Sequence, residues 1–131
     1  MVCLLMSGVS GCGVKGPPTA PGYTKPPIVR DLKYQVTENR LTLTWSIPSG
    51  TNSSKVVASA NVYRLKQPLD NTPCPDCPKA FRMIKKIPAR SNGMQFSDSL
   101  EKGFGYYYKI VLSDSGDRSG EDSNVVHYKY K

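Results

Sequence analysis

The sequence predicts an all-β domain in which short antiparallel strands form a sandwich. Two observations support this prediction. From Ile28 onward, short runs with a period of two residues recur along the chain, separated by clusters of Gly, Pro, Asn, Asp and Ser. In addition, no segment has the 3.6-residue period of an amphipathic helix. The chain has 131 residues, which is about the size of a single domain.

The clearest strand is the run from Leu41 to Trp45. Leu41, Leu43 and Trp45 alternate with two threonines, so the three apolar side chains share one face. About seven such strands in roughly 100 residues is the number found in an immunoglobulin-like sandwich. The expected strands cover residues 28–36, 41–45, 57–65, 81–87, 94–96, 106–112 and 125–130.

The first twelve residues resemble the end of a bacterial lipoprotein signal peptide. A short apolar stretch leads into Val9-Ser10-Gly11-Cys12, which matches the lipobox pattern of an aliphatic residue, two small residues and cysteine. The resemblance implies that residues 1–11 are removed, that Cys12 carries a diacylglycerol, and that the new N-terminus carries a fatty acid such as palmitate. A signal peptide needs a positive N-terminal region, and no Lys or Arg precedes Lys15. We therefore expect the signal peptide to be truncated at its start.

Residues 12–27 are expected to form a lipidated Pro/Gly-rich linker. Five of the fifteen residues 13–27 are Pro and three are Gly, so the segment buries too little apolar surface to fold. In the extended polyproline II form it would span roughly 45 Å. In Gram-negative lipoproteins, a residue other than Asp after the lipidated cysteine implies delivery to the outer membrane, and Gly13 fits this pattern. We expect a lipid-anchored protein of the cell envelope, on the outer membrane and facing the periplasm.

The remainder of the chain, residues 28–131, resembles a fibronectin type III domain. The resemblance rests on the order and spacing of four motifs rather than on any one of them. They are the tryptophan strand 41–45 followed by Pro48, the run 62–64, the run 96–98 with Leu100, Gly103, Tyr106 and Tyr108 after it, and the series Gly116, Ser119 and Ser123.

The expected core consists of apolar and aromatic residues of this domain. Trp45 is expected between the two sheets because it is the largest apolar side chain. Tyr106 occupies the place of a tyrosine corner, in which a buried ring has its hydroxyl bonded to nearby backbone. The residues expected in the core are Leu43, Trp45, Leu100, Tyr106, Tyr108 and Ile110.

A cysteine pair in the loop after the third expected strand is the main unusual feature. In an exported protein, Cys74 and Cys77 would form a local disulfide in the simplest case. Redox-active thiols and a metal site remain alternatives. A c-type haem needs His at position 78, where this chain has Pro78, and a structural zinc needs four ligands. We therefore expect no cofactor and no bound metal.

The net charge of +8 is unevenly distributed. Residues 77–97 contain five basic residues and no acidic residue, so a positive patch is expected. As ordinary solvated surface, its lysines would protect an edge strand from aggregation. As a binding surface, it would take an anionic partner such as peptidoglycan, lipopolysaccharide or an acidic protein. The residues of the patch are Lys79, Arg82, Lys85, Lys86 and Arg90.

No motif of catalysis or nucleic-acid binding is present in the sequence. There is no Gly-x-Ser-x-Gly, no phosphate-binding loop and no metal-binding helix motif, and His127 is the single histidine. We expect a non-enzymatic lipoprotein whose domain acts in protein–protein interaction or scaffolding, with an envelope protein as its partner and without nucleic acid. The alternatives are a thiol–disulfide or metal-handling factor that uses Cys74 and Cys77, and an accessory module that binds an anionic envelope polymer.

Overall fold

The computed structural model describes residues 25–48, 57–70, 75–77, 79–90 and 93–131. The expected signal peptide, the lipidation site Cys12 and most of the linker lie outside these residues, as does Cys74. Among the described residues, no helix is long and apolar enough to cross a membrane.

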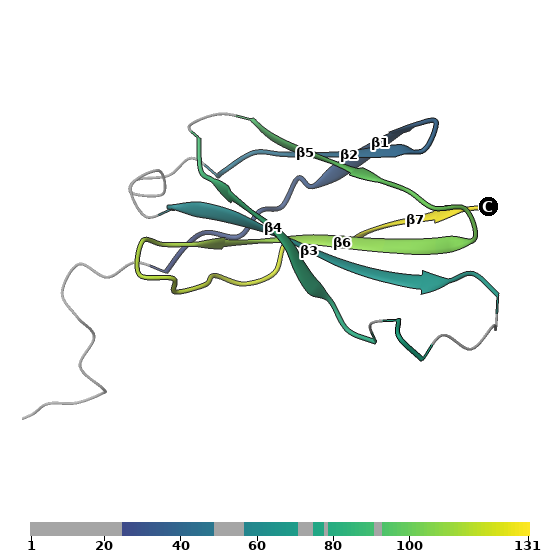
Figure 1. Cartoon of the computed structure of the whole chain (residues 1–131). Coiled ribbons are helices and arrows are strands. Elements are labelled where there is room, and N and C mark those ends of the chain that lie inside the picture. Colours follow the sequence, from purple (N-terminus) through teal and green to yellow (C-terminus); the bar gives the residue numbers. More distant parts are fainter. Residues whose placement is uncertain (1–24, 49–56, 71–74, 78, 91–92) are drawn as a thin grey trace, which may run out of the picture.

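Seven strands form two antiparallel sheets that face each other (Figure 1). One sheet has the order β1-β2-β5 and the other has the order β4-β3-β6-β7. This arrangement confirms the predicted all-β, immunoglobulin-like sandwich. The strands are β1 (Lys33–Thr37), β2 (Arg40–Trp45), β3 (Ser59–Pro68), β4 (Arg82–Pro88), β5 (Met94–Ser99), β6 (Phe104–Ser113) and β7 (Val126–Tyr130).

The core lies between the two sheets and follows the alternation of β2 and β6. On β2, the side chains of Leu41, Leu43 and Trp45 are buried, while the threonines between them are only partly covered. Burial of each such side chain contributes about 1.5–3 kcal/mol. All six residues expected in the core are buried, namely Leu43, Trp45, Leu100, Tyr106, Tyr108 and Ile110.

The first strand is shorter than the expected range 28–36, because β1 begins only at Lys33. Val29 and Leu32 nevertheless belong to the buried core. A side chain takes the place of a neighbouring strand here: the Asn124 amide accepts a hydrogen bond from the Leu32 N–H at 3.1 Å and donates one to the Leu32 carbonyl at 2.9 Å. The segment before β1 is therefore held by hydrogen bonds to the Asn124 side chain rather than by pairing with a neighbouring strand.

A β-bulge explains why the alternation of β4 is interrupted in the sequence. The pairing with β3 shifts between Val62, which lies opposite Lys85, and Tyr63, which lies opposite Met83. Ile84 is thus the extra residue of the bulge. As a result Ile84 and Ile87, which are three residues apart, both pack against the core.

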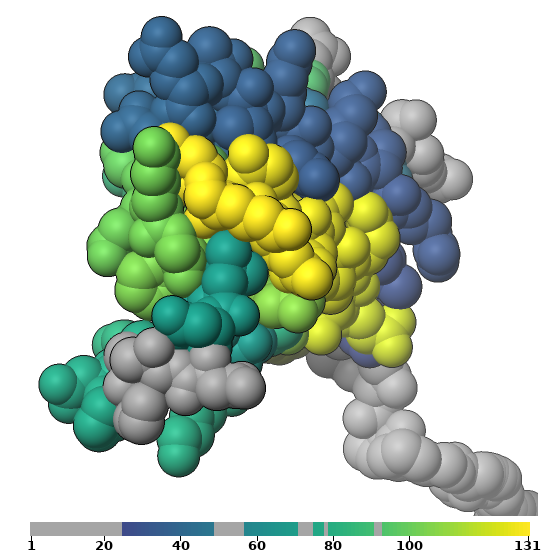
Figure 2. All heavy atoms as spheres, turned by 90° about the vertical axis from the view of Figure 1, so that its right-hand side faces the viewer, coloured from purple at the N-terminus to yellow at the C-terminus, as the bar shows by residue number. Residues whose placement is uncertain are grey.

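The β1 and β7 sides of the sandwich are in contact. Tyr34 of β1 meets Tyr128 of β7 edge to face, with ring centroids 5.8 Å apart. Figure 2 shows the yellow C-terminal residues directly beneath the blue residues of the three-stranded sheet. Further along, a Cβ atom on Gly120 would lie 2.8 Å from the Pro26 carbonyl oxygen, so the entering chain closely approaches the loop before β7. These contacts join the two sheets and the entering chain on this side of the sandwich.

We expect Asn124→Ala to release the entering segment. Loss of the two hydrogen bonds to Leu32 should lower the free energy of unfolding by about 1–2 kcal/mol, as measured by urea denaturation. Gln35→Ala is the matched control, because Gln35 is exposed on β1. Equal stability of the two variants would show that Asn124 does not fix this segment.

Candidate interaction surface

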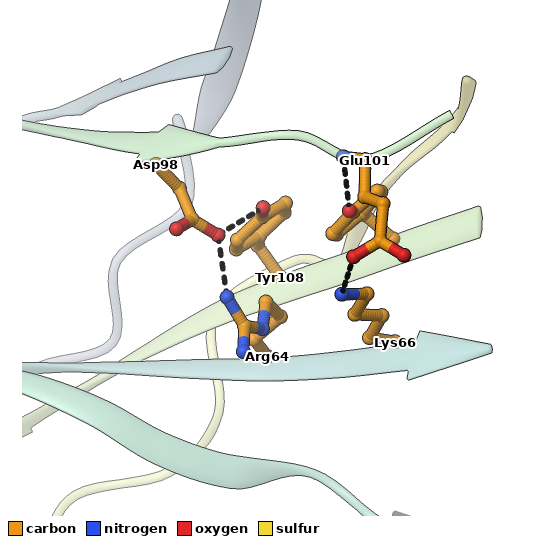
Figure 3. Close-up of polar contacts among 6 residues, drawn as sticks. Arg64, Lys66, Asp98, Glu101 and Tyr108 are labelled. Carbon is orange, nitrogen blue, oxygen red and sulfur yellow. Dashed lines mark hydrogen bonds and ion pairs between the residues drawn. The ribbon is translucent and has the colours of Figure 1, made fainter. Parts of the chain in front are cut away.

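A polar cluster joins the two sheets (Figure 3). One oxygen of the Asp98 carboxylate, on β5, accepts a hydrogen bond from the Tyr108 hydroxyl at 2.6 Å and lies 2.9 Å from Arg64 Nη1. Tyr108 belongs to β6 and Arg64 to β3, so the carboxylate connects one sheet to two strands of the other. Burial, together with the hydrogen bond to Asp98, raises the pKa of Tyr108 far above its ordinary value.

The sequence analysis quoted Asp98 only as part of a family motif and missed its role. A sign of that role is present in the alternation of β5. Met94, Phe96 and Asp98 lie two residues apart, and Leu100 continues the series. An acid in such a series faces the interior, where it needs a cation or hydroxyl partner.

The tyrosine corner lies next to this cluster. The Tyr106 hydroxyl accepts a hydrogen bond from the Glu101 N–H at 2.7 Å. The Glu101 carboxylate in turn pairs with Lys66 at 3.1 Å, and the Lys66 ammonium lies 4.4 Å from the centre of the Phe104 ring. An exposed pair of this kind contributes less than about 1 kcal/mol, so the buried Tyr106 hydrogen bond is the stronger element of the corner.

All five residues of the expected basic patch are exposed and gather at one edge of the four-stranded sheet. Lys86 pairs with Asp117 at 2.8 Å. Among the described residues, no acid lies within ion-pair distance of the other four. Three members of the patch lie on β4, which is an edge strand, and two flank it; in order they are Lys79, Arg82, Lys85, Lys86 and Arg90.

The register with β3 shows which basic side chains share a face of β4. Residues opposite each other in an antiparallel pair lie on the same face. Lys85 is opposite the core residue Val62, so it lies on the face toward the other sheet. Lys86 is opposite Asn61 and lies on the outer face. The cations therefore occupy both faces of the edge strand.

The outer face of the same sheet carries aromatic residues around one lysine. Lys109 Nζ lies 4.5 Å from the centre of the Phe81 ring and 5.6 Å from that of Tyr63. Beside them, His127 and Tyr107 stack face to face with centroids 4.0 Å apart. His127, which is half-buried, therefore stacks on an aromatic ring of the neighbouring strand.

Asp114, at the start of the loop after β6, stabilises the local structure of that loop. Asp114 accepts hydrogen bonds from the backbone N–H groups of Arg118 and Gly116, both at 2.9 Å. The backbone hydrogen bond from Arg118 is the main reason why the pKa of Asp114 lies below its usual value. Within the described ranges, no group of three or more His, Cys, Asp or Glu residues could hold a metal ion.

The thiol loop is only partly described. Cys77 is disulfide-bonded, and its expected partner Cys74 lies outside the described residues, as does Pro78. The Cys74–Cys77 pairing stays a prediction. The described part of the loop follows β3 and leads into β4, so it lies beside the basic edge strand.

Tyr108→Phe should change how stability depends on alkaline pH. The folded state favours the neutral hydroxyl of Tyr108, whereas in the unfolded chain it ionises near pH ~10. The stabilisation that the neutral Tyr108 hydroxyl gives the folded state is fully present below about pH 10, and it is lost as the pH rises further. Above about pH 10, the wild-type free energy of unfolding should fall by up to about 1.4 kcal/mol per pH unit more than that of the variant.

Urea denaturation across this pH range measures the difference. Tyr107→Phe is the matched control, because Tyr107 lies on the outer face and stacks on His127. If Tyr108→Phe and the wild type lose stability in parallel above pH ~10, the buried hydrogen bond to Asp98 does not have the role assigned to it.

No protein-family model matches the sequence, and no curated protein matches it. Solved structures do resemble the fold. The third fibronectin III domain of the human KIAA0343 protein matches with a TM-score of 0.61 at 13% identity, over 90% of this chain and 93% of that one. The kinase region of twitchin from C. elegans matches with a TM-score of 0.57 at 12% identity, over 81% of this chain. That match covers 17% of the longer twitchin chain and falls on its fibronectin type III part. The described domain thus has the fold of a fibronectin type III domain.

Proposed function

We propose that the protein is a non-enzymatic, lipid-anchored module of the cell envelope whose sandwich acts in protein–protein interaction or scaffolding. The observation that carries the proposal is the edge strand β4, which exposes three cations on a fold consistent with an interaction module. A sandwich of this kind is a rigid support, and its edges and strand-end loops provide the contact surface.

The anchor is proposed from the sequence of residues 1–27. The lipobox that ends at Cys12 supports lipidation, and acyl chains contribute about 0.8 kcal/mol per buried CH₂. The Pro-rich linker would hold the sandwich away from the lipid surface, on the periplasmic side of the outer membrane. In this position the domain can meet envelope proteins without being embedded in the bilayer.

Chemical crosslinking in intact cells tests the proposal. The wild type should stay in the membrane fraction and yield defined crosslinked proteins. Cys12→Ser removes the sulfur that would carry the lipid, so this variant should appear in the soluble fraction and lose crosslinks to membrane proteins. A Cys12→Ser variant that stays membrane-bound would refute the anchor, and a wild type with no specific protein crosslinks would refute the interaction role.

A thiol–disulfide or metal-handling role is the second candidate, because Cys77 is disulfide-bonded. A disulfide that closes a loop of only four residues gains little chain entropy, about 2 kcal/mol at most. It would then mainly shape the loop between β3 and β4.

We expect a Cys74→Ser/Cys77→Ser variant to lose no more than about 2 kcal/mol of stability and to keep its crosslinked partners. The measurements are urea denaturation and the crosslinking pattern. Thiol titration of the purified wild type should find this disulfide resistant to mild reductant. Loss of all partners in the variant, together with easy reduction of the wild type, would favour the redox role.

Binding of an anionic envelope polymer is a further candidate, which is supported by the four cations of the basic patch that pair with no acid in the described part of the chain. Co-sedimentation with peptidoglycan or lipopolysaccharide tests it. Binding of this kind should weaken with added salt, because exposed charges are screened within about 10 Å at moderate ionic strength.

A further inference from the structure

The free edge of β4 presents backbone groups that no other strand of the described chain covers. β4 ends its sheet and pairs only with β3. Just after the strand, the Ala89 N–H donates to the Ala58 carbonyl at 3.0 Å. Because the backbone groups of an antiparallel strand alternate in direction, those of Lys86 point away from β3. The same alternation, followed through the bulge, turns those of Met83 outward.

Two cations line the face of this edge that is turned toward the other sheet. Arg82 lies opposite Arg64, and Lys85 lies three residues further along β4. Like charges directly opposite each other on neighbouring strands are destabilising. Arg64 is neutralised by Asp98, whereas no described acid neutralises Arg82. Arg82 is therefore the member of this facing pair whose charge an external carboxylate would neutralise.

The same features disfavour pairing of β4 with a second copy of itself. Lysines and bulges on an edge strand oppose edge-to-edge association, and two β4 strands would bring like charges together. The cations of β4 instead favour pairing with a strand that carries negative charge. An example of such pairing is present at this edge, because the Asp117 carboxylate lies 2.8 Å from Lys86 Nζ.

We propose that β4 binds an extended acidic segment of a partner protein, as a deeper statement that rests on the proposed interaction function. Carboxylates of the segment pair with Arg82 and Lys85, and its backbone pairs with the outward groups of Met83 and Lys86. The Met83 side chain, 51% exposed on the outer face, provides an apolar contact. A polysaccharide or a lipid surface would satisfy the cations but would leave the backbone groups and Met83 unused.

Titration of the full chain with a synthetic peptide tests this proposal. The peptide has about ten residues, the upper range of strand length, and alternates Glu with Thr; a second peptide has Gln at every Glu position. We expect the Glu peptide to shift the NMR amide signals of Met83 and Lys86 and the Gln peptide to bind at least about tenfold more weakly. A Glu peptide methylated on its backbone nitrogens should also bind more weakly, because it cannot complete the ladder.

The variant Arg82→Gln/Lys85→Gln should bind the Glu peptide about tenfold more weakly than the wild type, without loss of folding stability. Lys102→Gln/Lys129→Gln is the matched control. It removes the same charge, and both residues are exposed; Lys129 lies on β7, the opposite edge of the same sheet. This control should keep nearly all of the affinity.

Several results would overturn the proposal. They are no binding of the Glu peptide, equal loss of affinity in both variants, or unchanged affinity of the methylated peptide. Anionic lipid vesicles or lipopolysaccharide that displace the peptide and bind more tightly than it would assign the edge to a lipid or polymer surface instead. Each of these results leaves the crosslinking test of the proposed function independent, since a partner protein can be captured through another surface.

Discussion

Burial of two facing rows of side chains between the sheets is the constraint on which the rest of the molecule depends. Leu41, Leu43 and Trp45 of β2 meet the row of β6 that includes Tyr106 and Tyr108. A shift of either strand by one residue would turn its whole row to solvent, so burial fixes the register. With the register fixed, the Asp98 carboxylate is held beside Tyr108 and Arg64, and β4 is held at the edge of its sheet with its cations exposed.

The two long sides of the sandwich differ in a way that matters for binding. On one side, the ring contact between Tyr34 and Tyr128 joins the two sheets. On the same side, the hydrogen bonds from Asn124 to Leu32 hold the segment that leads into β1. On the β4 side, the backbone edge is open in the part of the chain that the structure describes. Both β4 and β7 are edge strands of the four-stranded sheet, and the acidic strand proposed above would add at β4, because that edge carries the exposed cations.

Strand positions were largely predictable because period-two alternation reports directly on burial, as at Leu41 and Leu43. Three features were not. The start of β1 depends on Asn124, which is 92 residues away from Leu32, and no local pattern encodes such a contact. The bulge at Ile84 shows in the sequence only as a broken alternation. The basic patch could be predicted from the number of lysines and arginines in this part of the sequence. Which of them lie on each face of β4 could be assigned only from the register of β4 with β3.

The point at which the chain enters the sandwich gives the molecule a polarity. Pro26 approaches Gly120, just beyond the end of β6. The thiol loop leaves β3 at Pro68, which pairs with Phe104 at the start of β6. Ten residues of β6 separate these two ends, a length of roughly 33 Å. In a tethered molecule, the end of β3 from which the thiol loop departs would thus lie at the end of the sandwich opposite the tether, and β4 would run back along the flank.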